Sequence, residues 1–247
     1  MISLKSEHDI EMIKRSAKIL SKVMQQIQRF IKAGIKTIEI DKLAEELLKK
    51  ENAIAAFKNY RGFPANICIS INEEVVHGIP SDRTIKEGDI VSIDLGVNYN
   101  GYFSDAAITI PVGKINALRK KLIEVTKNAL MEGIRQARPN NHLSDISYAI
   151  QSYVERHGFS VVRQFVGHGI GFQLHEEPEI PNFGRPHQGP LLKSGMVFAI
   201  EPMVNMGSWE CKILDNGWTA ITKDGLDSAH FEHTLAITDN GPQILTN

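Results

Sequence analysis

Residues 90–110 read IVSIDLGVNYNGYFSDAAITI, and this stretch predicts the element around which the fold is built. Two runs rich in β-branched and aromatic residues flank the dipeptide Asn100-Gly101. Asn-Gly between such runs is typical of a β-hairpin with a type I′ turn, because both central residues of that turn need a positive φ. A two-residue turn pairs apolar residues across the hairpin: Leu95 with Ala106, Ile93 with Ile108 and Val91 with Ile110. One face is then continuously apolar, which supports this register.

The opposite face of the predicted hairpin carries two carboxylates. The register places Asp105 across from Gly96, so Asp94 and Asp105 become diagonal neighbours about 7–8 Å apart at the backbone. Two anions on one face of an apolar hairpin repel each other and lose hydration unless a cation lies between them. The alternative is a pair of solvated edge carboxylates, but the flanking residues are too apolar for an open edge. The pair therefore predicts a platform for a divalent metal ion.

Length, charge and cysteine content limit the class of protein. The chain has 247 residues, enough for one large domain or two closely joined halves. Lys and Arg number 28 against 29 Asp and Glu, and the net charge of −1 argues against nucleic acid or an anionic membrane as the main partner. Two cysteines, Cys68 and Cys211, do not make a disulfide framework. Because the sequence has neither a signal-peptide core nor a membrane-length apolar run, we expect a cytoplasmic protein.

An internal duplication predicts the architecture. Each half reads as two amphipathic helices, a strand, a histidine in a V-H-G-I or G-H-G-I motif, and a second strand. The matching histidines are His77 and His168. The helical patterns run from Ser6 to Gly34, from Thr37 to Leu48, from Leu118 to Ala137 and from Leu143 to His157. We expect an α+β fold with two pseudo-symmetric halves, in which the helices cover one face of a shared, curved antiparallel sheet.

Polar residues at strand ends and inner strand faces form one constellation. They are Asp94, Asp105, His168, Glu201 and Glu232. Four carboxylates and one imidazole cannot share a dry pocket unless about two divalent cations balance them. An oxygen-rich ligand set with one histidine is suited to manganese, iron or cobalt. It is less suited to structural zinc, which prefers sulfur-rich sites. Taken singly, Glu201 would be a turn residue and His168 a loop residue, so the prediction depends on the whole set.

Seven motifs make the sequence resemble the type I methionine aminopeptidases in their short bacterial form, which belong to the M24 metallopeptidases. The motifs are CISINEEVVHGIP, GDIVSIDLG, NGYFSDAA, GHGIG, LHEEP, MVFAIEP and FEHT. The resemblance covers essentially the whole chain. It implies the pita-bread fold, with a single catalytic domain over residues 1–247 and halves at approximately 1–112 and 113–247.

The family's five metal ligands fall on the five residues of the constellation. The resemblance therefore implies two divalent metal ions per chain: manganese, iron or cobalt, with zinc as a further candidate. Asp105 and Glu232 would bridge the ions, and Asp94, His168 and Glu201 would complete the two shells. Glu201 would also relay a proton from the attacking water.

Two histidines and four pocket residues complete the implied active site. His77 would hydrogen-bond the backbone after the scissile bond, and His175 would stabilise the oxyanion of the tetrahedral intermediate. A Met side chain needs an apolar, partly aromatic pocket, for which the matching positions are Tyr60, Phe63, Cys68 and Trp218. Residues 57–61 and Leu174 depart from the common family pattern at this pocket. The alternatives are a local loop hydrogen bond for His77, a surface position for His175 and ordinary core packing for the aromatic residues.

The activity implied by the resemblance is removal of the N-terminal initiator Met from nascent polypeptides when the second residue is small, by a water activated between two metals. We expect a monomer with no nucleic-acid substrate and no membrane partner, and a transient association with the ribosome is left open. A prolidase or X-Pro aminopeptidase is an alternative within the fold, although those enzymes usually carry an extra N-terminal domain. A metal-free binding module is another, and it would be expected to have lost ligands.

Overall fold

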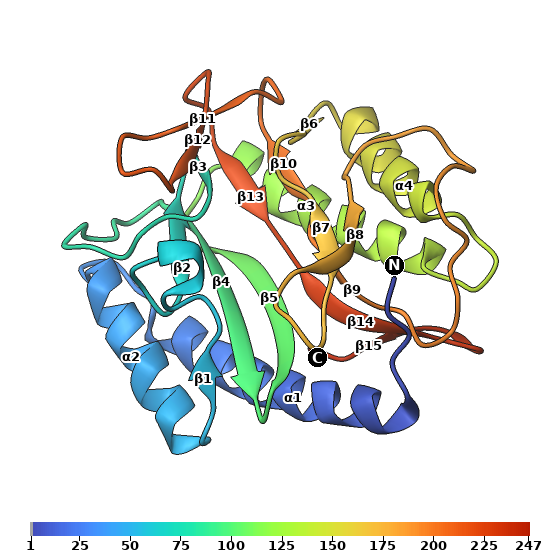
Figure 1. The fold of residues 1–247 in the computed structure, drawn as a ribbon. Coiled ribbons are helices and arrows are strands. Elements are labelled where there is room, and N and C mark those ends of the chain that lie inside the picture. Colours follow the sequence, from blue (N-terminus) through green and yellow to red (C-terminus); the bar gives the residue numbers. More distant parts are fainter. Residues whose placement is uncertain (1) are drawn as a thin grey trace.

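The computed structural model describes residues 2–247, and the predicted hairpin lies at its centre (Figure 1). Strands β4 (Ile90–Tyr99) and β5 (Tyr102–Pro111) pair antiparallel. Asn100 and Gly101 have φ angles of 53° and 83°, as the predicted turn requires. Leu95 pairs with Ala106 and Gly96 with Asp105, so the predicted register is confirmed.

The first half packs two helices against the sheet of this hairpin. The elements are α1 (Glu7–Phe30), α2 (Thr37–Lys50), β1 (Ile54–Ala55) and β2 (Cys68–Ile71), and the strand order is β1-β4-β2 with β5 also paired to β4. Ser6 and Asp9 form a capping box at the start of α1. The prediction that α1 reaches Gly34 is wrong, because Gly34 and Ile35 leave the helix to hydrogen-bond with Ile85.

The second half places two further helices against a five-stranded sheet. The helices are α3 (Ala117–Gln136) and α4 (Leu143–Arg156). The strands are β7 (Gly167–Gly169), β8 (Glu176–Ile180), β9 (Val197–Ile200), β14 (His233–Thr238) and β15 (Gly241–Ile244), in the order β15-β14-β9-β7-β8. Strand β7 contains His168, which taken singly would be a loop residue, and β8 is likewise not indicated by its local sequence. Their strand character comes from pairing with each other and with β9, since GHG and EEPEI have little intrinsic β propensity.

Two three-stranded sheets complete the fold. One has the order β13-β10-β6 and the other the order β11-β12-β3. Their strands are β3 (Glu74–Val76), β6 (Ser160–Val161), β10 (Met203–Asn205), β11 (Cys211–Ile213), β12 (Ala220–Thr222) and β13 (Ser228–His230). Strand β6 is short, and its partner β10 runs alongside it for two residues only. A short 3₁₀ helix, η1 (Tyr60–Gly62), interrupts the loop that follows β1.

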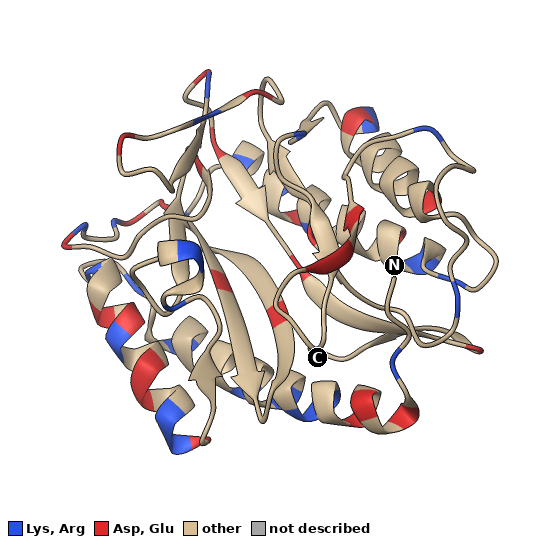
Figure 2. Cartoon of the chain, viewed as in Figure 1, with Lys and Arg blue, Asp and Glu red and all other residues tan. Residues whose placement is uncertain are grey.

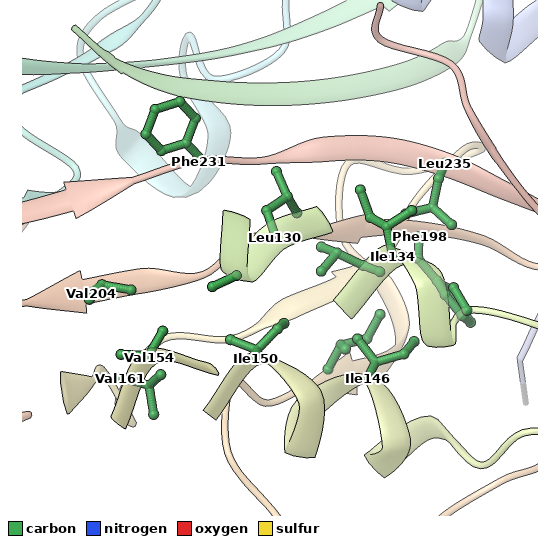
Figure 3. Close-up of a cluster of buried hydrophobic side chains, with 14 of the residues drawn as sticks. Leu130, Ile134, Ile146, Ile150, Val154, Val161, Phe198, Val204, Phe231 and Leu235 are labelled. Carbon is green, nitrogen blue, oxygen red and sulfur yellow. The ribbon is translucent and has the colours of Figure 1, made fainter. Parts of the chain in front are cut away.

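Separate hydrophobic cores lie under the two pairs of helices. Ile27 of α1, Ile40 of α2 and Ile93 of β4 belong to the core of the first half. Figure 3 shows the core of the second half, where side chains from α3 and α4 meet those of the sheet. The labelled residues are Leu130, Ile134, Ile146, Ile150, Val154, Val161, Phe198, Val204, Phe231 and Leu235. This arrangement agrees with the predicted pseudo-symmetric α+β design, while the division at residues 112 and 113 stays a prediction.

Side-chain and backbone hydrogen bonds join the two halves along β5. The backbone N–H of Asp105 donates to Oγ1 of Thr234 at 2.9 Å, and the Thr234 hydroxyl donates to the carbonyl of Asp105 at 2.8 Å. The backbone N–H of Glu232 donates to the carbonyl of Ala107 at 2.8 Å. These bonds bring Asp105 of the first half and Glu232 of the second half to the boundary between the halves, which we call the seam. None of the helices within residues 2–247 is long and apolar enough to cross a lipid bilayer.

Candidate active site and metal centre

Asp94 and Asp105 lie on paired strands of the central hairpin. Asp94 sits on β4 with Cys68 of β2 opposite it on the other side, and Asp105 sits on β5 opposite Gly96. A Cβ at Gly96 would lie 2.7 Å from the ring of Phe57, so glycine is needed where the loop 57–61 crosses the strand. Figure 2 shows acidic segments in the middle of β4 and β5, whereas α1 and α2 carry interspersed charges of both signs.

The second half contributes three more of the predicted ligands. His168 belongs to β7, Glu201 follows β9, and Glu232 precedes β14. His168, Glu232 and Asp105 each offer one ligand atom, and these three atoms lie within 4.8 Å of one another. The Nδ1 atom of His168 lies 2.9 Å from the carbonyl of Gly169, which orients the ring and leaves Nε2 for the cluster.

The Glu201 carboxylate lies between two imidazoles. Nε2 of His168 is 3.5 Å from Oε1, and Nε2 of His230 is 3.5 Å from Oε2. His230 is 1% exposed, and its Nε2 has no hydrogen-bond partner within the described part of the chain. His230 was not among the site residues predicted from the sequence. The available signal was its position in HFEHT, two residues before Glu232 and therefore on the same side of an extended chain.

The carboxylates of the cluster have strongly shifted pKa values. Burial raises the pKa of Asp94 and of Glu201 to about 7 in each case. Burial, together with the charges of neighbouring carboxylates, raises the pKa of Asp105 and of Glu232 well above the ordinary range. Buried carboxyl groups that crowd one another in this way hold protons unless a cation replaces them.

The donor set fits divalent metal ions. Asp94 Oδ1, Asp105 Oδ1 and Glu232 Oε1 are buried and have no hydrogen-bond partner among residues 2–247. Buried polar atoms in native proteins are nearly always paired, so three such oxygens in one cluster point to a missing cationic partner. Carboxylate oxygens with one imidazole nitrogen suit manganese, iron or cobalt.

A small cavity of about 140 Å³ opens onto the carboxylates. The structure brings all of the sequence-predicted site residues to its walls: the five proposed ligands, His77, His175, Tyr60, Phe63, Cys68 and Trp218. The rings of Phe63 and Trp218 meet edge to face, with centroids 5.1 Å apart. Phe57 and Arg61 also line the cavity and were not among the predicted pocket residues. Leu174, at which the sequence departs from the family pattern, is 2% exposed and packs in the core beside this pocket.

His175 is exposed and also lines the cavity, with its ring beside those of His168 and Tyr60. Its Nδ1 lies 3.0 Å from the Tyr60 hydroxyl, and its ring centroid lies 4.2 Å from that of His168. Loss of hydration, together with the nearby charge of His168, lowers the pKa of His175, so this imidazole is neutral near pH 7. In the tautomer whose Nδ1 accepts from the Tyr60 hydroxyl, the Nε2–H of His175 is available to a substrate oxygen.

His77 closes the other side of the cavity. Its φ of 60° is uncommon for a residue other than glycine, and its ring meets Phe165 and Trp218 edge to face. Burial lowers the pKa of His77 to about 4. A neutral, conformationally constrained imidazole on the cavity wall suits hydrogen bonding to a peptide better than charge stabilisation.

Comparison with known proteins agrees with this geometry. The model of metallopeptidase family M24 matches residues 11–239. A methionine aminopeptidase of Clostridium perfringens is 53% identical over 246 residues, which cover 100% of this chain and 99% of the relative. The crystal structure of methionine aminopeptidase from Rickettsia prowazekii superposes with a TM-score of 0.99 at 42% identity, over 100% of both chains. The prolidase of Pyrococcus horikoshii matches with a TM-score of 0.80 at 27% identity, and the match covers 99% of this chain but 63% of the prolidase.

The chain belongs to metallopeptidase family M24. This family and its pita-bread fold agree with the prediction from the sequence motifs. Within this family, its relatives over the full length of the chain are methionine aminopeptidases. They identify it as a methionine aminopeptidase by class, which is a hydrolase that uses divalent metal ions.

Proposed function

We propose that this enzyme removes N-terminal Met from polypeptides whose second residue is small, with two divalent metal ions held at the carboxylate seam. The proposed ligands are Asp94, Asp105, His168, Glu201 and Glu232. The proposal rests on one observation above all: buried, unpartnered carboxylate oxygens from both halves of the fold face a single cavity that has an aromatic wall.

The metal ions would supply a water nucleophile at neutral pH and a Lewis acid for the scissile carbonyl. Asp105 and Glu232 are the proposed bridging ligands. This role is supported by their burial, since each is less than 5% exposed, and by their positions on opposite sides of the seam. Either carboxylate belongs to the group of three residues whose ligand atoms lie within 4.8 Å of one another, so its removal would take a ligand from the centre of the site.

Glu201 is the proposed proton relay. Its carboxylate lines the cavity and lies 3.5 Å from Nε2 of His168 and 3.5 Å from Nε2 of His230, which places it where a water in the cavity would lose a proton. It would take a proton from the attacking water and pass it to the leaving amine.

His175 is the proposed oxyanion donor. Tyr60 engages Nδ1, which directs Nε2–H toward the substrate carbonyl oxygen. A donor placed before the reaction is more effective than water, because it needs no reorganisation as charge develops. His77, on the opposite wall, is the proposed hydrogen-bond partner of the substrate backbone after the scissile bond.

The wall formed by Tyr60, Phe63, Cys68 and Trp218 is the proposed Met pocket. Its mixture of aromatic surface and a buried thiol suits a flexible thioether side chain. His77 and the β7 segment crowd the site of the residue after Met, which supports the preference for a small second residue. Nascent polypeptides in the cytoplasm are the proposed substrates, with the enzyme acting as a monomer. The free state of both cysteines is compatible with a reducing compartment.

Peptide hydrolysis with and without metal tests this function. The purified protein is stripped with a chelator, reloaded with Mn²⁺ or Co²⁺, and assayed on Met-Ala-Ser, Met-Leu-Ser and Ala-Pro. We expect release of Met from Met-Ala-Ser that depends on added metal and little turnover of the other two substrates. Preferential cleavage of Ala-Pro would favour prolidase activity, the alternative within the fold. Turnover that survives complete metal removal would refute the proposed centre.

A further inference from the structure

The buried ammonium group of Lys5 is the feature on which this inference is built. The Lys5 side chain is 1% exposed, and Lys is rarely buried unless its charge is paired. Nζ forms an ion pair with Oε2 of Glu176, a residue distant in sequence at the start of β8. Removing one partner of such a pair is strongly destabilising, because the other charge stays buried without compensation.

Glu176 in turn holds the loop of residues 171–176, which we call the His175 loop. Its other oxygen, Oε1, accepts hydrogen bonds from the backbone N–H groups of Phe172 at 2.6 Å and Gln173 at 3.0 Å. The Lys5 ammonium lies 4.7 Å from the centroid of the Phe172 ring. One carboxylate thus connects the N-terminal segment to two successive amides of the loop.

The Lys5 stem also packs against the first residue of this loop. Gly171 has a φ of +147°, and a Cβ there would lie 2.6 Å from Cε of Lys5. The carbonyl of Gly171 accepts a hydrogen bond from the N–H of Phe103 at 2.8 Å, which fixes this end of the loop to β5. At the other end of the contact, the backbone N–H of Lys5 donates to the carbonyl of Gly195 at 2.7 Å. Lys5 is therefore held in place by its backbone as well as by its charge.

His175 directly precedes Glu176, so the position of its ring depends on how firmly that carboxylate is held. We propose that Lys5 is a positioning residue for His175, acting through Glu176 and the His175 loop. The inference rests on the proposed oxyanion role of His175. A displacement of about 1 Å at a catalytic group can cost about 10²-fold in rate. An oxyanion donor acts mainly in the transition state, so the loss falls on kcat and leaves KM nearly unchanged.

Lys5→Met tests the proposal, because it keeps an unbranched side chain of similar length and removes the ammonium group that pairs with Glu176. We expect kcat of the metal-loaded enzyme on Met-Ala-Ser to fall about 10- to 100-fold, with KM within about threefold of wild type and metal content unchanged. Hydrogen exchange at the amides of Phe172 and Gln173 should become faster. Lys18→Met is the matched control, since Lys18 is exposed on α1, and it should leave both kcat and exchange unchanged.

A double-mutant cycle separates positioning from a general structural role. In a His175→Ala background, adding Lys5→Met should change kcat by less than about twofold, because the group that Lys5 positions is already absent. Losses that multiply, or a folded Lys5→Met enzyme with wild-type kcat, would overturn the proposal. If His175→Ala itself keeps wild-type kcat, the proposed oxyanion role fails and this inference fails with it. An impaired His175→Ala beside a normal Lys5→Met refutes the positioning role alone.

Two further variants keep the test decisive if Lys5→Met does not fold. Lys5→Arg retains the charge and should recover most of kcat. Glu176→Gln retains an oxygen that can accept the two loop amides while weakening the attraction to Lys5. We expect it to lower kcat without loss of metal, and wild-type kcat in folded Glu176→Gln would overturn the proposal.

Discussion

The Nε2 atom of His230 lies 3.5 Å from Oε2 of Glu201, directly opposite the contact that His168 makes with Oε1. Each oxygen of the Glu201 carboxylate thus faces one imidazole nitrogen. His230 is held by its backbone, which exchanges hydrogen bonds of 2.8 Å with the Thr109 hydroxyl. A buried residue that is not one of the five proposed ligands therefore lies against the Glu201 carboxylate.

Replacing His230 should weaken metal binding. His230→Leu removes the nitrogen beside Glu201 but keeps an apolar side chain, and residues that orient metal ligands typically contribute about 10- to 100-fold in affinity. We expect Mn²⁺ affinity, measured by calorimetric titration, to fall within that range. His230→Gln, whose amide can still donate to Glu201, should lose less. Equal affinities for wild type and His230→Leu would show that Glu201 is oriented without His230.

Replacing Asp105 should abolish turnover. Asp105→Ala removes a proposed bridging carboxylate, after which the remaining ligands cannot hold both ions. We expect no measurable Met release even with excess metal, and fewer than two metal equivalents by elemental analysis. Asp82→Asn, a carboxylate whose side chain is 87% exposed, is the control. Activity of Asp105→Ala within about tenfold of wild type, or roughly 1.4 kcal/mol, contradicts the bridging role.

Replacing His175 should slow the reaction without loss of metal. His175→Ala removes one oxyanion donor, which usually lowers kcat by about 10²–10³. Tyr60→Phe removes the hydroxyl 3.0 Å from Nδ1 and should produce a smaller decrease of the same kind. Steady-state kinetics and elemental analysis measure both quantities. Loss of a metal equivalent from His175→Ala would make His175 a ligand and refute the oxyanion role.

Substrate choice should follow the size of the second residue. His77 and β7 line the space next to the proposed metals, so a long side chain after Met must displace the scissile bond, at a cost of about 10² in rate for about 1 Å. We expect kcat/KM on a Met-X-Ser panel to be high for Gly, Ala, Ser, Thr, Cys, Pro and Val, and about 10²-fold lower for Leu. Comparable kcat/KM values for Met-Ala-Ser and Met-Leu-Ser would show that the second residue is not crowded. The cause would then be sought at residues 57–61 and Leu174, where the sequence departs from the family pattern.

The metal-free protein should lose stability as the pH rises above about 6.5. Folding raises the pKa of Asp94 and Glu201 from 3.8 and 4.5 to about 7, so the folded state binds more protons and loses stability as the pH rises through that value. His77, whose pKa falls from 6.5 to about 4, acts in the opposite sense, but only below pH 6.5. We expect Tm of the metal-free protein to fall between pH 6.5 and 8, and added Mn²⁺ to restore it at pH 8. A metal-free Tm that rises between pH 6.5 and 8 would contradict the raised pKa values of Asp94 and Glu201.

Local sequence determined the hairpin and the helices. Asn100-Gly101 and the alternating apolar residues around it suffice for the turn and the register, because both depend on contacts within a few residues. The capping box of Ser6 and Asp9 is equally local. Once the register was known, Asp94 and Asp105 had to share a face, and the motifs of the second half supplied the remaining proposed ligands.

Only the tertiary structure decided how the catalytic groups are supported. Strands β7 and β8 exist because they pair with each other and with β9, and nothing in their own sequence demands it. The contacts of His230 with Glu201, of Tyr60 with His175 and of Lys5 with Glu176 join residues 29, 115 and 171 positions apart. Periodicity and turn chemistry act over a few residues, whereas the contacts of Tyr60 and Lys5 form only when the two halves meet, and that of His230 only when separate strands of the second half come together. The sequence therefore determined which groups carry the proposed chemistry, and the packing of distant segments determined how each of them is held.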